Sequence, residues 1–455
     1  MITYSIIQKS QLEGARRIDA EYYQPEYLQY IDQLQHFELH PLDSLTSKID
    51  VGFVSSMVSH FQSEGIPLLR TQNVQEFLID PENDVVYIDE EFHNKLRKSQ
   101  VFPGYLLLAR SGSIGNVGVV PDKFPITNSA DIILIKVSTD RLIPEFLAAF
   151  LNSKYGRFQV ERGSSGGLQG HINLYSLEKL QVPITRKRFQ EEVKNLVLSG
   201  LNLIEESKRL YDQADALLLE ELALKDVQVE EDLSFIVNLS DVNNVSRADA
   251  DYFQPKYEKL ISKLELKAVN KLEDFVKDYS TGFPFKSENY QEDGIPLIRI
   301  NNIKKGFIDL SDTAYLSDRD YSLSPKDIAK SGDVVLSMSG TIGMSAVIPV
   351  DVPKCSVNQR ILRFSSKNID SDYLVLVLNS IVGFYQLERI GTGGVQTNIS
   401  YRDIQNILIP VLPKSTQEKI AELVRKSHEA RKKSKELLEE AKRKVEDMIE
   451  KGGGG

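Results

Sequence analysis

The chain has 455 residues, of which 41% are hydrophobic and 26% charged, a composition typical of a globular protein with two or three domains. It lacks any run of about 18 apolar residues, and its first residues do not resemble a secretory signal, so we expect a cytoplasmic protein without a membrane span. A single cysteine and six histidines argue against a disulfide framework and against a structural zinc site.

The net charge of −10 at pH 7 is unfavourable for a protein that binds nucleic acid by itself. Binding to phosphates requires a local basic surface rather than a basic total, and a partner chain can also supply the cations. The charge therefore argues against an independent DNA-binding protein, but it is compatible with a subunit of a larger complex.

The sequence contains an internal duplication. Five short motifs recur in the same order, at an offset that drifts from 230 to 227, and they divide the chain into halves of roughly 1–230 and 231–451. The sequences between the motifs diverge, which indicates one scaffold that carries two different surfaces. The pairs are Asp19 to Pro25 (DAEYYQP) with Asp249 to Pro255 (DADYFQP), Gly65 to Arg70 (GIPLLR) with Gly294 to Arg299 (GIPLIR), Ser111 to Gly115 (SGSIG) with Ser339 to Gly343 (SGTIG), Gly166 to Gln169 (GGLQ) with Gly393 to Gln396 (GGVQ), and Gln190-Glu191 with Gln417-Glu418.

Each half follows the same order of elements. A mixed domain comes first, at 1–185 and 231–412, and a helical region follows it, at 186–230 and 413–451. Glycine and proline punctuate short apolar runs in the domains, which predicts strands such as Tyr105 to Leu108 and Ile132 to Ile135. Pro144 to Tyr155 and Asp372 to Asn379 are expected to be short helices. The glycines at 452–455 are expected to form a flexible tail.

Long helices are predicted over Phe189 to Leu224 and Gln417 to Ile449, where glycine and proline nearly vanish. Both carry apolar or small residues at spacings of three and four, which is typical of a coiled coil. The two seams superimpose at an offset of 227, and small residues coincide, so we expect a closely packed antiparallel pair with pseudo-twofold symmetry. The alternative is that each helix packs only on its own domain. The main seam residues are Val193, Leu196, Leu203 and Leu210 in the first helix, and Ile420, Leu423, Leu437 and Val445 in the second.

The sequence lacks several motifs that would indicate chemistry. It has no P-loop pattern, no His-Glu-x-x-His and no Cys-x-x-Cys, and the absence of any Pro-Pro dipeptide removes the signature of amino-methyltransferases. Glu440-Ala441-Lys442 matches half of a nuclease motif, but it falls on a predicted coiled-coil helix and is interpreted as a solvated surface. We therefore predict a chain that is not an enzyme and binds neither a metal nor a cofactor.

The duplicated motifs, in this order, resemble those of the specificity subunits of type I restriction-modification systems. The resemblance covers essentially residues 1–451, and the order and duplication of the motifs are more specific than any motif alone. It implies an α+β fold with two globular mixed α/β target-recognition domains, separated by two long helices that form an antiparallel coiled coil. Each domain would read one half of a bipartite site in double-stranded DNA.

The resemblance also implies partners. The spacer helices would hold the two domains apart and dock two methyltransferase subunits, and restriction subunits would join that assembly. S-adenosylmethionine, ATP and Mg would then belong to the partner subunits. Two other classes remain open, a fused or degenerate restriction enzyme and a scaffold that does not bind DNA.

Two equivalent segments that follow apolar strands are candidates for DNA contact. Arginine pairs with guanine, and asparagine or glutamine with adenine, through paired hydrogen bonds in the major groove. The alternative is a purely structural turn. The candidates are Arg70, Thr71, Gln72 and Asn73 in the first half, and Arg299, Asn301, Asn302 and Lys304 in the second.

Further candidates lie in two glycine-containing turns of each half. Glycine lets the backbone approach a phosphate or another chain closely, so these loops serve either positional DNA contact or packing. Met338 replaces Arg110 in the second half. Two domains that recognise different DNA sequences must differ at such positions, but evolutionary drift of the sequence produces the same difference. The repeated pairs Asp19/Tyr22 and Asp249/Tyr252 are interpreted as structural. The candidates are Arg110, Ser111, Gln169 and His171 in the first half, and Ser339, Thr341, Gln396 and Asn398 in the second.

Overall fold

The computed structural model describes residues 4–8, 20–55, 57–82, 84–165, 171–225, 232–245, 247–352, 354–391 and 398–452. The chain divides into two compact units. Unit 1 comprises residues 1–205 and 431–455, and unit 2 comprises residues 206–430. Each unit contains one sheet-rich domain together with part of both long helices, α6 (Lys187–Glu221) and α13 (Lys414–Glu450).

The domain of unit 1 consists of two four-stranded sheets and short helices. The strand orders are β2-β9-β6-β7 and β4-β3-β8-β5, and β1 pairs with β12 and β10 with β11. The elements are α1 (Pro25–Leu34), β1 (Leu39–Pro41), β2 (Thr46–Val51), β3 (Ile66–Leu69), β4 (Val86–Ile88), α2 (Glu90–Lys95), β5 (Gln100–Val101), β6 (Leu106–Ala109), β7 (Val117–Val119), β8 (Thr127–Ser129), β9 (Ile132–Val137), α3 (Pro144–Asn152), α4 (Lys154–Gly163), β10 (Ser164–Ser165), β11 (His171–Ile172), α5 (Leu174–Glu178) and β12 (Gln181–Pro183).

The domain of unit 2 repeats this topology. Its sheets have the orders β14-β23-β20-β21 and β18-β15-β22-β19, and β13 pairs with β24 and β16 with β17. The elements are α7 (Leu239–Val245), α8 (Pro255–Leu264), β13 (Val269–Lys271), β14 (Val276–Ser280), β15 (Ile295–Ile298), β16 (Ile303–Lys304), β17 (Phe307–Ile308), β18 (Ala314–Leu316), α9 (Asp318–Tyr321), β19 (Ile328–Ala329), β20 (Val334–Ser337), β21 (Ser345–Val347), β22 (Cys355–Val357), β23 (Ile361–Ser366), α10 (Ser371–Asn379), α11 (Ile381–Gly391), α12 (Tyr401–Ile404) and β24 (Leu408–Pro410).

Strand pairing follows the duplication. In unit 1, β3 runs parallel to β8 with Leu68 opposite Asn128. In unit 2, β15 runs parallel to β22 with Leu297 opposite Ser356. Every other pairing within the four-stranded sheets is antiparallel in both units. The duplication seen in the motifs therefore extends to the strand order and strand directions of both four-stranded sheets.

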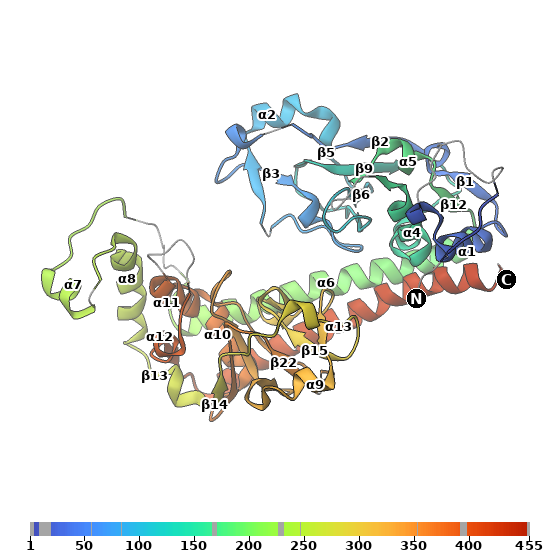
Figure 1. Cartoon of the computed structure of the whole chain (residues 1–455). Coiled ribbons are helices and arrows are strands. Elements are labelled where there is room, and N and C mark those ends of the chain that lie inside the picture. The colour runs from blue at the N-terminus through green and yellow to red at the C-terminus, as the bar shows by residue number, and fades with distance from the viewer. Residues whose placement is uncertain are drawn as a thin grey trace. The chain divides into compact units, whose positions relative to one another are not determined.

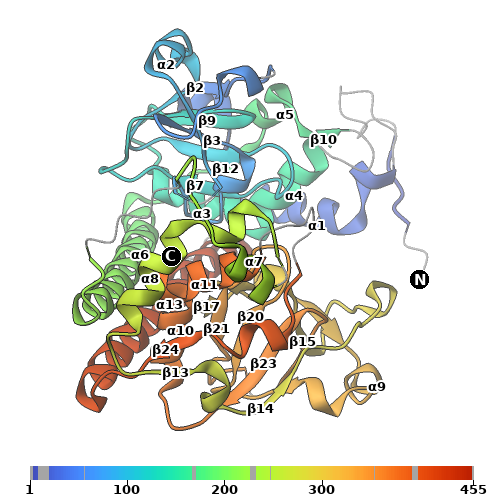
Figure 2. The same cartoon turned by 90° about the vertical axis from the view of Figure 1, so that its left-hand side faces the viewer.

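The core of each unit lies between one sheet and a buried helix. Helix α3 is apolar around its whole circumference, and Phe146 and Phe150 are fully buried in the core that also contains Leu106 and Ile133. Helix α10 packs in the same way against β20 and β23 in unit 2 (Figure 2). Among the described residues, no single helix is long and apolar enough to cross a membrane, although the bent pair α10–α11 has the length and composition together.

The segments of α6 and α13 lie side by side and antiparallel within each unit (Figure 1). In unit 1 the hydroxyl of Ser434 donates to the carbonyl of Gly200 at 2.7 Å, and Lys444 Nζ lies 2.9 Å from Glu192 Oε2. In unit 2 the hydroxyl of Ser427 donates to the carbonyl of Ser207 at 2.7 Å. At the offset of 227 the pair Gly200–Ser434 maps onto the pair Ser427–Ser207, although the donating serine is not the equivalent one in the two contacts. Antiparallel packing of the two helices is confirmed within each unit, and the alternative of helices that contact only their own domains is wrong.

The centre of the helix interface is shifted from the predicted seam. Val193, Ile420 and Val445 are fully buried as predicted, but five leucines of the seam are only half-buried. Residues spaced by three and by four lie on the same helix face, so the pattern alone does not fix which of two neighbours is central. The half-buried residues are Leu196, Leu203, Leu210, Leu423 and Leu437, and the buried neighbours include Val197, Ile204, Val424 and Leu438.

We expect Gly200→Val to lower the free energy of unfolding by about 1–3 kcal/mol because it overpacks the helix interface. A Cβ atom at Gly200 would already lie 2.8 Å from Leu438 Cγ and 3.4 Å from the carbonyl oxygen of Ser434. Valine has a higher helix propensity than glycine, so a loss at Gly200 would arise from packing, and Leu198→Val, at an exposed position of the same helix, is the control for valine away from this tightly packed site. Urea denaturation measures both variants, and equal effects would show that the helices are not closely packed at Gly200.

Candidate DNA-recognition loops

The turn after β3, and the equivalent turn after β15, are held by a buried asparagine. Asn73 and Asn302 are each 1% exposed, and their side-chain oxygens accept hydrogen bonds from the backbone N–H groups of Arg70 and Arg299, at 2.8 and 2.9 Å. The amide nitrogen of Asn302 donates to two further backbone carbonyls. Both asparagines therefore shape the turn, and their side chains are not exposed for base contact.

The exposed polar side chains of the first turn gather around one aspartate. Arg70 Nη2 donates to the backbone carbonyl of Asp84 at 2.6 Å and lies 3.2 Å from its carboxylate, which also accepts a hydrogen bond from Gln72. Asp84 itself is 77% exposed. The Asp84 carboxylate thus holds the arginine and the amide side by side. Because an exposed ion pair contributes only about 0–1 kcal/mol, releasing both groups from Asp84 would cost little free energy.

The second turn has the same arrangement. Arg299 Nη2 donates to the carbonyl of Asp312 at 2.7 Å, and the amide of Asn301 donates to the Asp312 carboxylate at 2.9 Å. In both turns the Nε atom of the arginine is buried without a hydrogen-bond partner among the described residues. An unsatisfied buried donor is unfavourable for stability, and it recurs at the same position of both turns.

The turn after β6 carries a second polar cluster in unit 1. Arg110 Nη1 lies 3.0 Å from Asp131 Oδ1, and Ser111 donates to the other oxygen of that carboxylate at 3.0 Å. Asp131 has a φ of +53°, in the left-handed region that bends the chain into β9. Arg110 Nε also donates to the carbonyl of Ile172, next to the exposed His171.

Unit 2 has a single arginine in place of this ion pair, and the side chain to which it donates a hydrogen bond is neutral. Met338, which stands in place of Arg110, is 5% exposed, and Arg360 precedes β23 with a φ of +65°, as Asp131 precedes β9. Arg360 is exposed, and its Nη1 donates at 3.2 Å to the side-chain oxygen of Asn398, a neutral group. Sequence analysis missed Arg360, although the exchange of both members of the pair, Arg110 to Met338 and Asp131 to Arg360, was a signal that could have found it.

These loops converge at one edge of each domain. The N–H of Ala130, which precedes Asp131, donates to the carbonyl of Leu69, which precedes Arg70. In unit 2 the N–H of Asn358 donates to the carbonyl of Ile298 in the same way. Parallel β3 and β8 of one sheet end here, and in the other sheet β6 ends and β9 begins here, so neighbouring strand ends of two sheets present the polar clusters.

The remaining candidates fall into three groups. Lys304 and Thr341 are exposed, Thr71 is half-buried, and Ser339 is 7% exposed and forms a backbone bridge with Asn398. Gln169 and Gln396 lie outside the described residues, as does Asp19. The DNA-contact predictions for the exposed side chains stay predictions.

The tyrosines repeated in the two halves, Tyr22 and Tyr252, lie in structural contacts. Arg162 of α4 stacks on the ring of Tyr22 and donates to its carbonyl, and Arg389 of α11 makes the equivalent contacts with Tyr252. These contacts tie the segments before α1 and α8 to α4 and α11, which are short helices of the same domain.

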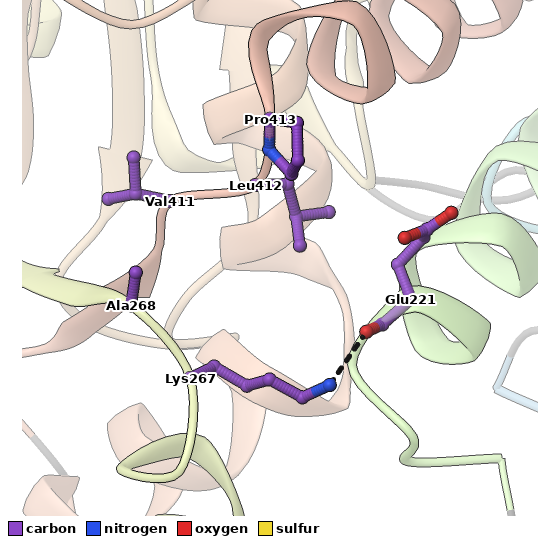
Figure 3. A pocket seen from close by; sticks show the side chains of 6 residues that line it. All are labelled: Glu221, Lys267, Ala268, Val411, Leu412 and Pro413. Atoms are coloured by element: carbon purple, nitrogen blue, oxygen red, sulfur yellow. Dashed lines mark hydrogen bonds between the residues drawn. The ribbon is translucent and has the colours of Figure 1, made fainter.

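A hollow in unit 2 lies at the C-terminal end of α6 and does not resemble a catalytic cleft (Figure 3). Its lining is mostly apolar, and Lys267 donates to the backbone carbonyl of Glu221 at 3.1 Å, which caps the helix end. Among the residues that the structure describes, no group of three or more His, Cys, Asp or Glu side chains could hold a metal ion.

Comparison with known proteins decides the family. The profile of the type I restriction modification DNA specificity domain matches residues 55–194 and again residues 265–442, which together make up well over half of the chain. The chain belongs to this family. A DNA specificity domain recognises DNA and does not itself carry catalytic chemistry, in agreement with the prediction of a chain that is not an enzyme.

Individual members of the specificity family are distant. The chain is 29% identical over 191 residues to the type I restriction enzyme MjaVIII specificity subunit of Methanocaldococcus jannaschii, a match that covers 40% of this chain and 44% of that one. It is 26% identical over 153 residues to the EcoAI specificity subunit of Escherichia coli, covering 32% and 26%. Each match thus spans less than half of the relative. The crystal structure of the S subunit from M. genitalium aligns over 91% of this chain and 95% of that one, with 16% identity and a TM-score of 0.42.

We expect Asn302→Ala to destabilise the second domain by about 1–3 kcal/mol, because it removes the acceptor of the Arg299 N–H and leaves two backbone carbonyls without their donor. The matched control is Asn301→Ala, at the neighbouring exposed position, with an expected change within about 0.5 kcal/mol. Thermal or urea unfolding distinguishes the two. Similar stabilities would mean that the buried asparagine does not hold the turn.

Proposed function

We propose that this chain is the DNA-recognition subunit of a type I restriction-modification system, and that each domain reads one half of a bipartite site. The observation that carries this proposal is a loop cluster built twice on one topology with different exposed side chains. Arg70, Gln72 and the Arg110–Asp131 pair are exposed or half-exposed in unit 1, and Arg299, Asn301 and Arg360 occupy the corresponding edge in unit 2. The two half-sites would then differ in sequence.

The chemistry of the loops suits base recognition. A guanidinium can donate two hydrogen bonds to guanine, and the amide of Gln72 or Asn301 can both donate to and accept from adenine. Asp84 and Asp312 hold these groups in place before DNA binds, so less side-chain conformational entropy is lost on binding. On contact, the base edge would replace the exposed carboxylate as the partner of the arginine.

The net charge of the chain and the repeated helix segments support a proposal about its partner subunits. Aspartates neutralise three of the four candidate arginines, and the chain carries a net charge of −10, so its own attraction to phosphates is weak. Additional cations would come from two methyltransferase subunits, which we place on the repeated outer faces of α6 and α13. Restriction subunits would complete the complex, and S-adenosylmethionine, ATP and Mg would be bound by those partners.

We expect the double variant Arg299→Ala, Asn301→Ala to relax recognition at one half-site only. Each lost base contact should cost about 1–3 kcal/mol of discrimination at its own position. The matched variant Arg70→Ala, Gln72→Ala should relax the other half-site. Sequencing of the sites that are methylated by the complex with the methyltransferase partner measures both. Equal relaxation of both half-sites by either variant would contradict two independent readers.

We also infer that helix length sets the gap between the half-sites. Inserting four residues after Leu203 and four after Ala430 would lengthen both helices at one level of the pair, between the Gly200–Ser434 and Ser207–Ser427 contacts. The added length is roughly 6 Å, or one to two base pairs at about 3.4 Å each. The preferred gap should lengthen accordingly, with both half-sites unchanged.

The control for this experiment is the single insertion after Leu203. It lengthens α6 alone, puts the serine contacts out of register and should reduce methylation at all gaps, since the pair no longer matches. Methylation of the original gap by the doubly extended chain, with the efficiency of the parent, would refute a role of helix length.

A further inference from the structure

The turns after β3 and β15, which begin at Arg70 and Arg299, are called the recognition turns here. A short hairpin follows each recognition turn and lies against the helix pair of its own unit. In unit 1, Val74 bridges to Ile79, and in unit 2, Ile303 pairs with Ile308. Alignment of the two recognition turns places Glu76 on Lys305 and Phe77 on Gly306. The tips have the same left-handed backbone, with φ of +62° at Phe77 and +87° at Gly306. The hairpins therefore share one conformation but carry different side chains.

In unit 1 the hairpin contacts α13 through an ion pair. Glu76 Oε2 lies 2.7 Å from Lys442 Nζ, which is also 2.8 Å from Glu439, and the second oxygen of Glu76 binds Arg157. The Lys442 side chain is 14% exposed. Burial disfavours its charged form, but hydrogen bonds to Glu439 and Glu76 outweigh burial and raise the pKa of Lys442 above its ordinary value.

In unit 2 the same position has the opposite charges. The offset of 227 between the helices places Asp215 of α6 where α13 has Lys442, and the hairpin contributes Lys305 in place of Glu76. One oxygen of Asp215 is buried without a hydrogen-bond partner among the described residues. Burial raises the pKa of Asp215, and the nearby Lys305 opposes that rise.

The sizes of the packed side chains are exchanged as well. A Cβ atom at Gly306 would lie 2.6 Å from the ring of Tyr211, so only glycine fits against this tyrosine. At the equivalent helix position α13 has Leu438, which belongs to the same hydrophobic core as the bulky Phe77. A small hairpin tip thus faces a large helix residue in unit 2, and a large tip shares a core with a smaller helix residue in unit 1.

We propose that these hairpins and helix positions form a docking code that assigns each recognition domain to its own segment of the helix pair. In the exchanged arrangement Glu76 would meet the carboxylates of Asp215 and Asp212, and Phe77 would meet Tyr211. Lys305 would meet Lys442, with Glu439 as partial compensation. Short linkers join β12 (Gln181–Pro183) to α6 (Lys187–Glu221) and β24 (Leu408–Pro410) to α13 (Lys414–Glu450), so chain connectivity sets the order of the domains. The code would instead act on the fit of each domain to its own helix segment and oppose the exchange of domains with a second copy.

The first test reverses charges in the full chain. We expect Lys305→Glu and Asp215→Lys each to lower the midpoint of thermal unfolding by about 2–4 °C, and the double variant to recover at least half of the loss. Glu76→Lys and Lys442→Glu should behave in the same way, with less recovery because Arg157 keeps its charge. Lys304→Glu and Lys433→Glu, at exposed neighbouring positions, are the controls and should leave the midpoint unchanged. Double variants no more stable than the sum of the single losses would overturn the proposal.

The second test uses a full-length chain in which segments 20–185 and 250–412 are transposed on the unchanged helices. We expect a lower unfolding midpoint, and a fraction of dimers by native mass spectrometry because domains exchange between copies. Adding Asp215→Lys and Lys442→Asp should raise the midpoint of the transposed chain, although the same two changes lower it in the parent. This reversal of sign is specific to the code. A transposed chain as stable and monomeric as the parent would refute it, whatever the DNA specificity of either chain.

Discussion

The close approach of α6 and α13 is the contact on which both units depend. Ser434 against Gly200 and Ser427 against Ser207 place small residues where the two backbones meet, so the hydroxyls reach the carbonyls of the opposite helix. Each domain core then closes on the helices, with Val193 and Val445 in one cluster and Ala214 and Ile420 in the other. A larger residue at Gly200, Ser207, Ser427 or Ser434 would move a helix and the domain core that packs against it.

The turns after β3 and β15 contain two kinds of residue, those that shape the backbone and those that face solvent. Asn73 and Asn302 satisfy the backbone of their turns from inside, and this part of the turn is the same in both units. The exposed positions around them differ, with Asp131 exchanged for Arg360 at the same left-handed bend. Because the buried asparagine fixes the turn, exposed side chains can change without altering the loop, which would allow one fold to carry the two specificities proposed above.

Much of this architecture could be predicted from the sequence, because duplication and helical periodicity are properties of residue order. The long helices lie within three residues of their predicted bounds, and the small residues of the seam do pair. The centre of the interface was placed one residue off at Leu203 and Leu437, because the period of 3.6 leaves two neighbours equally plausible. Arg360 was missed since its importance depends on the loss of Asp131, a residue distant in sequence from the motifs. That Asn302 is buried could not be seen in a motif of polar residues.

The arginine–aspartate pairs also bear on how the proposed function would achieve selectivity. Phosphate contacts attract a protein to any DNA sequence, whereas base contacts distinguish sequences. An arginine held by Asp84 or Asp312 gains little binding free energy at a random DNA sequence, because it would exchange a carboxylate for a base edge that does not match its hydrogen-bond donors. A matching base edge offers two aligned acceptors and can outcompete an exposed carboxylate, whose own ion pair contributes about 0–1 kcal/mol. An acidic chain with neutralised arginines would therefore give up overall affinity, which partner subunits can supply, and retain the difference between right and wrong sites.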